Sequence, residues 1–131
     1  MDKKRILVAD DEPAVLAVNG KMIERLGHEV EMHQEGMKAF ESFMADPDRI
    51  DLVVADIRMP RMSGNALADR IHEVRPDTPV ILCSGDGEFG GLGNHAPENV
   101  RSILSKPVRF KELETAVNRA LEPLEPSCRS G

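Results

Sequence analysis

Hydrophobic residues in this chain follow two patterns that alternate along its length. Short apolar runs rich in branched residues are typical of strands that are buried on both faces of a sheet. Such runs lie at residues 5–9, 51–56 and 79–84, and residues 101–105 are predicted to form a last strand. Residues 28–33 instead alternate polar with apolar positions, which indicates an edge strand with one exposed face. The pattern therefore predicts five strands.

Between these runs, apolar residues recur at the spacing of one face of an amphipathic helix. Pro13 suits the first turn of the first helix, and Gly27 ends that helix. Ser63 is a candidate N-cap for the third helix, which should end near Arg75 because Pro76 disfavours its continuation. The predicted helices cover about residues 13–26, 35–45, 63–75 and 110–121.

The segment after residues 79–84 is the least regular part of the chain. Residues 85–93 hold five of the ten glycines, and each costs a helix up to about 1 kcal/mol relative to alanine. A fourth helix is therefore expected to be short, displaced or mobile. Prolines 123 and 126 end the last helix and indicate a flexible tail. We expect one domain over residues 1–122, followed by a tail at 123–131.

The alternation of strands and helices predicts the fold class. Short connections of this kind require a parallel sheet with right-handed crossovers and helices on both faces. We expect an α/β fold with a doubly wound, five-stranded parallel sheet of strand order 2-1-3-4-5, which is flavodoxin-like. Ligands of such sheets bind at the carboxyl ends of the strands, near the switch in strand order. The residues that end the strands are therefore the candidates for chemistry.

Composition limits the kinds of partner. The formal charge of −6 over 131 residues, without a cluster of Lys and Arg, argues against direct nucleic-acid binding. No apolar run approaches the roughly 20 residues of a membrane span, and the N-terminal run is too short for a signal peptide. Cys83 in an apolar strand and Cys128 in the polar tail are not expected to form a disulfide. These features predict a cytoplasmic protein without membrane contact.

Polar residues end four of the predicted strands. Asp10 and Asp11 end the first, Asp56 the third, Ser84 the fourth, and Lys106 follows the fifth. Carboxylates at one edge would repel unless they share a cation, and Mg²⁺ fits because it prefers carboxylates, water and phosphate oxygens. Asp56 could then be a nucleophile that forms an aspartyl phosphate, with Lys106 and Ser84 as donors to the phosphoryl oxygens. Each residue alone would be explained by an ordinary turn or a solvated side chain, but their combination favours chemistry.

The chain resembles the receiver domain of two-component response regulators from residue 4 to about residue 121. The resemblance rests on Asp10-Asp-Glu-Pro13, Asp56-Ile-Arg-Met-Pro60 with Met62 and Gly64, Ser84-Gly85 and Lys106-Pro107. It implies that Asp56 takes a phosphoryl group from the phosphohistidine of a kinase. It also implies that Mg²⁺ is bound directly by Asp11 and Asp56, through water by Asp10, and by the backbone carbonyl of Arg58.

The same resemblance assigns roles at the other two strand ends. Ser84 would contact the phosphoryl group and move on activation, and Lys106 would be its cationic partner, with a cis Lys106–Pro107 peptide. The implied partners are a histidine kinase or phosphotransfer protein and a downstream protein. The chain would not be an enzyme beyond self-phosphotransfer and autodephosphorylation. Because little sequence follows Leu121, we expect a stand-alone receiver or the receiver of a longer regulator or hybrid kinase.

Two features bear on how the site would be switched. Receivers commonly have Phe or Tyr three residues before the lysine as a rotameric switch, whereas this chain has Ile103, which has no ring to swing. We therefore predict that activation orders or relocates the glycine-rich loop at residues 85–93. Arg58 and Asp86 have opposite charges and could pair across the mouth of the site, or remain exposed and contribute little.

Two other kinds of protein would share part of this residue pattern. A pseudo-receiver that only binds proteins would be expected to lack Asp11, Asp56 or Lys106, and all three are present. A phosphotransfer enzyme of the haloacid-dehalogenase type also uses a nucleophilic aspartate with Mg²⁺. Such an enzyme would need Asp-x-Asp at the end of the first strand, where this chain has Asp10-Asp11-Glu12.

Overall fold

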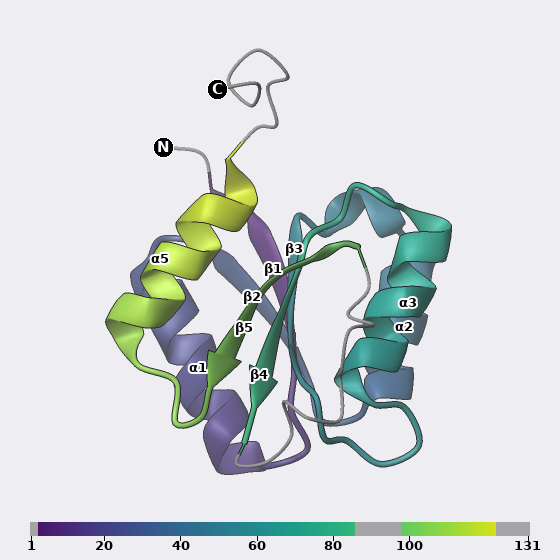
Figure 1. Ribbon diagram of the computed structural model, residues 1–131. Helices are drawn as coiled ribbons and strands as arrows, with labels where there is room; N and C mark the ends of the chain where they lie inside the picture. Colours follow the sequence, from purple (N-terminus) through teal and green to yellow (C-terminus); the bar gives the residue numbers. More distant parts are fainter. Residues whose placement is uncertain (1–2, 86–97, 123–131) are drawn as a thin grey trace.

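The computed structural model describes residues 3–85 and 98–122 (Figure 1). The strands are β1 (Arg5–Ala9), β2 (Glu29–His33), β3 (Leu52–Asp56), β4 (Val80–Ser84) and β5 (Val100–Ser105). The helices are α1 (Pro13–Arg25), α2 (Gly36–Ala45), α3 (Gly64–Val74) and α5 (Phe110–Leu121), with a short 3-10 helix, η1 (Pro47–Arg49). All neighbouring strands pair in parallel, in the order β2-β1-β3-β4-β5. The predicted doubly wound, flavodoxin-like fold is confirmed.

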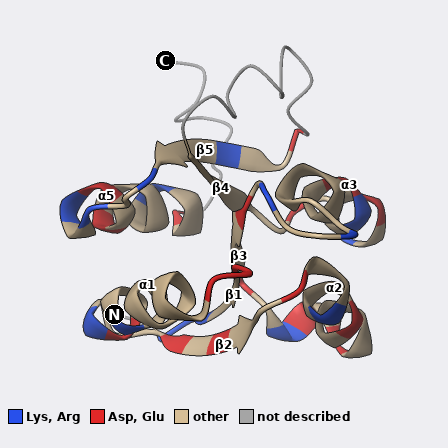
Figure 2. Cartoon of the chain, turned by 90° about the horizontal axis from the view of Figure 1, so that it is seen from below, with Lys and Arg blue, Asp and Glu red and all other residues tan. Residues whose placement is uncertain are grey.

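The sheet separates two layers of helices. α1 and α5 cover one face, and α2 and α3 lie side by side on the other (Figure 1; Figure 2). β1 contributes side chains to both layers, because successive side chains of a strand point to opposite faces of the sheet. Leu7 and Ala9 pack in the core with α2 and α3, whereas Ile6 and Val8 pack in the core with α1 and α5. The hydrophobic core therefore consists of two halves that share one sheet.

Strand burial follows the predicted pattern in the centre of the sheet, where every residue of β3 and β4 is buried. β2 is an edge strand with exposed and partly buried positions, but its burial does not follow the alternation of its sequence, because Met32 is 49% exposed and Glu31 is partly buried. β5, the other edge strand, is only partly buried. Most of the glycine-rich segment and the predicted tail lie outside the described residues. No helix among residues 3–85 and 98–122 is both long and apolar enough to cross a membrane.

The end of β3 and the start of α3 are held close together. The hydroxyl of Ser63 accepts the backbone N–H of Ala66 at 3.2 Å, which confirms the predicted N-cap, a contact that contributes about 1 kcal/mol. Gly64 donates its N–H to the Ile57 carbonyl at 2.9 Å. A Cβ on Gly64 would lie 2.4 Å from the carbonyl oxygen of Asp56. Only glycine allows this approach, which fixes the loop that follows Asp56.

Candidate functional site

Three carboxylates meet at the carboxyl ends of β1 and β3. Asp10 follows β1 directly, Asp56 ends β3, and these strands are neighbours in the sheet. One oxygen of each, together with one of Asp11, lies within 4.8 Å of the others. Asp10 and Asp56 are 1% and 4% exposed, whereas Asp11 is exposed. Figure 2 looks onto this edge and shows acidic residues in red at the ends of β1 and β3. The structure thus gathers the three aspartates that the sequence placed at the strand ends.

Lys106 reaches this cluster from the end of β5. Its Nζ lies 3.1 Å from Oδ1 of Asp56, 3.4 Å from Oδ2 of Asp10 and 3.9 Å from Oε1 of Glu12. Burial alone would lower the pKa of the lysine ammonium, but its hydrogen bond to Asp56 and the nearby negative charges raise that pKa. The ammonium therefore stays charged. The expected cis peptide between Lys106 and Pro107 is present.

The carboxylates have more negative charge than Lys106 can balance. Oδ1 of Asp10 accepts the backbone N–H of Glu12 at 2.9 Å. Oδ2 of Asp10 is buried and accepts no hydrogen bond from the described residues, and its contact with Lys106 is long at 3.4 Å. One ammonium faces three carboxylates, which repel one another at these separations. The oxygen donors and the uncompensated charge fit a hard divalent cation such as Mg²⁺.

Ser84 lies beside the acidic cluster but its hydroxyl is occupied locally. Cys83 pairs with Asp56 in the sheet, so the next residue, Ser84, lies just beyond the end of β3. The Ser84 hydroxyl donates to the carbonyl of Gly85 at 3.1 Å, the kind of local turn contact that an isolated serine would make. The Ser84 carbonyl accepts the N–H of Lys106 at 2.8 Å. The backbone therefore ties the ends of β4 and β5 together next to Asp56.

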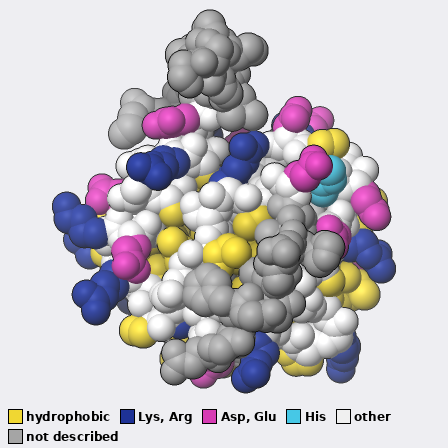
Figure 3. All heavy atoms as spheres, viewed as in Figure 1, with side chains coloured by type: hydrophobic (Ala, Val, Ile, Leu, Met, Phe, Trp, Pro, Cys, Tyr) yellow, Lys and Arg dark blue, Asp and Glu magenta, His cyan; other side chains and the backbone are white. Residues whose placement is uncertain are grey.

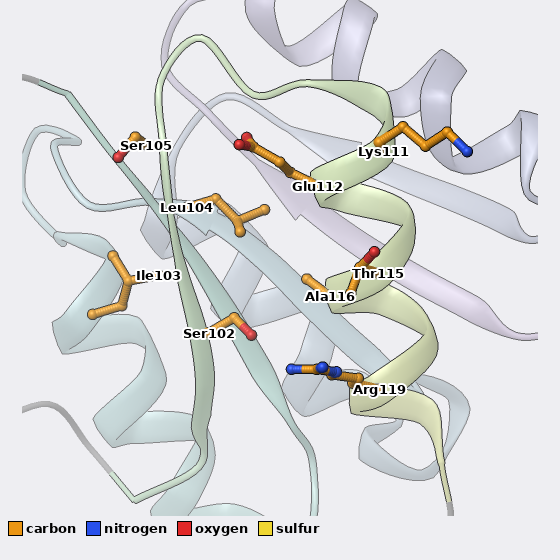
Figure 4. Close-up of a pocket in the computed structure, with 9 residues that line it drawn as sticks. All are labelled: Ser102, Ile103, Leu104, Ser105, Lys111, Glu112, Thr115, Ala116 and Arg119. Carbon is orange, nitrogen blue, oxygen red and sulfur yellow. The ribbon is translucent and has the colours of Figure 1, made fainter.

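Ile103 lies on the side of β5 that faces away from α5. It is partly buried and packs against the core formed with α2 and α3, whereas its neighbour Leu104 packs against the α1 and α5 core. Figure 4 shows Leu104 pointing toward α5, across a groove of about 650 Å³ between β5 and that helix. On the face drawn in Figure 3, hydrophobic side chains gather around β5. The role of Ile103 as a switch position stays a prediction.

The loop after β3 combines exposed polar residues with buried anchors. Arg58 is exposed on this loop, whereas Asp86 lies outside the described residues, so their pairing across the site stays a prediction. Met59 and Met62 are 6% and 4% exposed and belong to the core formed with α2 and α3. The sequence motif contained both methionines but gave no sign that they anchor the loop.

Two contacts of the site were not anticipated. Glu12 approaches Lys106 at 3.9 Å, although its place beside Asp10 and Asp11 in the first motif could have indicated a role. Gly36, at the start of α2, lies against Met62 so closely that a Cβ would meet the Met62 carbonyl oxygen at 2.5 Å. No local pattern indicates this second contact, because its partners are 26 residues apart.

A flavodoxin-like sheet with an acidic cluster and a lysine at its carboxyl edge defines a class of α/β proteins with a site at the switch in strand order. Within that class, the chain belongs to the response regulator receiver domain family, because the sequence model of that family matches residues 6–118. Receiver domains of this family interact with histidine kinases and downstream effectors.

Curated relatives support the family assignment. The transcriptional regulatory protein GlrR of Escherichia coli K12 is 30% identical over 122 residues, which are 93% of this chain and 27% of that protein. The DNA-binding transcriptional regulator NtrC of Azospirillum brasilense is 34% identical over 126 residues, 96% of this chain and 26% of that protein. The chain thus spans about a quarter of the length of these relatives.

Solved structures agree with the sequence relatives. A receiver domain protein from Clostridium thermocellum is 30% identical and superimposes with a TM-score of 0.85, covering 90% of this chain and 94% of that one. A receiver protein from Sinorhizobium medicae is 31% identical with a TM-score of 0.80, covering 92% and 95% of the two chains.

Proposed function

We propose that the chain accepts a phosphoryl group on Asp56 from the phosphohistidine of a histidine kinase or phosphotransfer protein, in a Mg²⁺-dependent reaction. The observation that carries this proposal is the placement of Asp56. Its buried carboxylate ends the central strand β3, shares a cluster with Asp10 and Asp11, and lies 3.1 Å from the Lys106 ammonium. This arrangement supports the proposal, because the side chains that would act as nucleophile, oxygen ligands and cation lie close together.

The residues that would hold Mg²⁺ are Asp11 and Asp56 directly, Asp10 through water, and Arg58 through its backbone carbonyl. When bound, the ion would neutralise the carboxylates and the oxygens of the incoming phosphoryl group. This ligand set is carried over from the family motifs, and the distances among the three carboxylates are compatible with it.

The chemistry of the transfer uses the chain's own groups. An oxygen of Asp56 attacks phosphorus, an O–P bond forms, and the N–P bond of the phosphohistidine breaks with its electron pair going to the imidazole. The product is an aspartyl phosphate, which water later hydrolyses. Lys106, held charged by the carboxylates, would stabilise the negative charge on the phosphoryl oxygens, and Ser84 would exchange its contact with Gly85 for one with the phosphoryl group.

The output of this reaction would be protein contact that depends on phosphorylation. The chain would act in the cytoplasm, as a stand-alone receiver or as part of a longer regulator or hybrid kinase, without touching nucleic acid itself. Its catalysis would be limited to self-phosphotransfer and autodephosphorylation. A pseudo-receiver is disfavoured because Asp11, Asp56 and Lys106 are all present and gathered at one edge.

Intact mass after phosphorylation tests the proposal. The wild-type chain is incubated with Mg²⁺ and acetyl phosphate or a phosphorylated kinase, beside Asp56→Ala and the matched control Asp69→Ala, an exposed aspartate on α3. We expect one phosphoryl adduct in the wild type and in the control, and none in Asp56→Ala. An adduct that persists in Asp56→Ala, or that never forms in the wild type with a competent donor, would refute the assignment.

A further inference from the structure

The loop between Asp56 and Gly64 touches the start of α2 at one tightly packed point. At this point Gly36, the first residue of α2, lies against Met62. A Cβ on Gly36 would lie 2.5 Å from the Met62 carbonyl oxygen and 3.1 Å from the Met62 Cβ. An adjacent ion pair, Glu35 with Arg61 at 3.4 Å, is exposed and contributes little. The backbone contact, rather than the charge pair, sets how closely the loop and α2 approach.

The loop is short and its far end is already fixed. Gly64 lies against the Asp56 carbonyl, and its N–H bonds to Ile57, so the start and the end of the loop are held together. Within the loop, the Met62 N–H donates to the Pro60 carbonyl at 2.7 Å. A displacement of Met62 therefore cannot be absorbed at the loop's ends and reaches the residues that follow Asp56.

From this geometry we propose that Gly36 is a positioning residue for the acidic site. Because Gly36 has no side chain, the loop can lie close to α2. This close approach would hold the backbone carbonyl of Arg58 where it can bind Mg²⁺ together with Asp11 and Asp56. The inference rests on the proposed function, because the Arg58 carbonyl is one of the proposed Mg²⁺ ligands. Gly36 would act only through the loop, without contacting the carboxylates or the phosphoryl group.

A side chain at position 36 should move the loop rather than the helix. α2 is anchored by Ala39 and Phe43, which are fully buried in the core. Pro60 and Arg61 of the loop are exposed. Met62 anchors the loop in the core, but its flexible side chain can repack there when its backbone shifts, whereas the ring of Phe43 cannot. A Cβ at 2.5 Å from the carbonyl oxygen is about 0.9 Å inside an ordinary contact. Mg²⁺ demands near-ideal ligand geometry, so a shift of this size is expected to weaken its binding.

The test compares Gly36→Ala with a matched control, Gly20→Ala. Gly20 is also a helical glycine, but the one atom too close to its added Cβ would be the sulfur of Met32 at 2.7 Å, near the end of a flexible side chain that is 49% exposed. The next atoms, Cγ of Met32 and Cγ1 of Val30, lie at an ordinary contact distance of 3.6 Å. Mg²⁺ affinity is measured by calorimetry, because the chain has no Trp or Tyr for fluorescence. We expect Gly36→Ala to bind Mg²⁺ roughly tenfold more weakly, equivalent to about 1.4 kcal/mol, and Gly20→Ala to bind it as the wild type does.

Kinetics separate positioning from a loss of folded protein. In acetyl phosphate reactions, the Mg²⁺ concentration at half-maximal rate should rise about tenfold in Gly36→Ala, while excess Mg²⁺ restores most of the rate. Because Mg²⁺ also favours the folded chain, a merely unstable variant would show a tenfold shift only if about nine tenths of it were unfolded without Mg²⁺, which circular dichroism measures directly. The same shift in a Gly36→Ala chain that is folded without Mg²⁺ therefore reports positioning. Equal Mg²⁺ affinity in Gly36→Ala and the wild type would overturn the inference.

A measurement on the unmodified chain covers the case in which Gly36→Ala does not fold. In amide NMR spectra, Mg²⁺ should shift the Gly36 and Met62 signals with the same midpoint as those of Asp11 and Asp56, and leave Gly20 unchanged. If Gly36 and Met62 do not respond while the aspartates do, the inference is wrong. If the wild type neither binds Mg²⁺ nor is phosphorylated, the proposed function itself fails, which is a distinct result.

Discussion

Replacing Asp11 by asparagine should stabilise the protein in the absence of divalent cations. The substitution keeps the size of the side chain and removes one of three negative charges that lie within 4.8 Å of one another. Asp11 is the informative member of the cluster, because no ion pair to Lys106 is found for it among the described residues, whereas Asp10 and Asp56 both have one. Its removal relieves the repulsion from two nearby carboxylates and costs only a longer-range attraction to the Lys106 ammonium.

The size of the effect follows from the distances. Two unit charges 4.8 Å apart repel by about 3.5 kcal/mol at an effective dielectric constant of 20, and by about 0.9 kcal/mol in bulk water. Asp11 is exposed, so solvent screening favours the lower figure. Relief from two neighbours then gives about 1–2 kcal/mol in the free energy of unfolding, which corresponds to roughly 3–8 °C in Tm.

Urea unfolding followed by circular dichroism measures this change. At low salt without Mg²⁺, Asp11→Asn should be the more stable protein, and the difference should shrink near 1 M salt, where the screening length is about 3 Å. Mg²⁺ at ten times its dissociation constant should stabilise the wild type by about 1.4 kcal/mol. The variant should gain less, because it lacks a proposed ligand.

Asp69→Asn serves as the control, since it removes an exposed aspartate of α3 with the same change in net charge. It should leave stability nearly unchanged in both conditions. If Asp11→Asn is no more stable than the wild type at low salt, while the control behaves as expected, the carboxylates do not repel appreciably. The electrostatic argument for a cation at this site would then be wrong.

Three further predictions concern groups outside the acidic cluster. Burial, followed by the charge of Asp56, raises the pKa of the Cys83 thiol to about 12. In a Cys128→Ser variant, iodoacetamide at pH 8 should therefore modify Cys83 only after unfolding. Modification of the native chain at the rate of a free thiol would contradict this. Burial also lowers the pKa of His28, whose Nδ1 accepts the backbone N–H of Lys4 at 3.1 Å. The contribution of His28 to stability is present above pH 6.5 and is lost as pH falls. The non-titrating His28→Gln variant should therefore lose less free energy of unfolding, measured in urea, than the wild type between pH 7.5 and pH 5. An equal loss in both proteins would count against the assignment. Burial would raise the pKa of Glu31, but hydrogen bonds from three neighbouring side chains lower it to about 2. Its stabilisation is present above pH 4.5 and lost as pH falls toward 2, and Glu31→Gln should flatten acid unfolding in that range, whereas an unchanged acid profile would refute this.

Much of the fold could be predicted because it depends on local patterns. Branched apolar runs marked the strands, and the alternating residues 28–33 marked β2 as an edge. Ser63 and Pro13 marked helix starts that the structure contains. These signals act over a few residues, through side-chain alternation and capping, and can therefore be recognised without the tertiary structure.

The acidic cluster could also be predicted, for a topological reason. In a parallel sheet all strands end at the same edge, so residues that end strands converge even when they are far apart in sequence. Asp10, Asp56 and Lys106 were placed together by this rule. The rule says nothing of where a side chain turns once it reaches the edge, and the Ser84 hydroxyl turns to the neighbouring carbonyl of Gly85.

The sequence by itself determined the five strands, the four α-helices that the structure describes, the strand order expected for them, and the set of residues at the carboxyl edge. Only the tertiary structure decided which oxygen lies near the Lys106 ammonium, that Glu12 joins its contacts, and that Met59 and Met62 are anchors rather than surface residues. It alone brought Gly36 against Met62. The physical reason is that periodicity specifies the face on which a residue lies, whereas the distance between two faces depends on how whole helices and loops pack together.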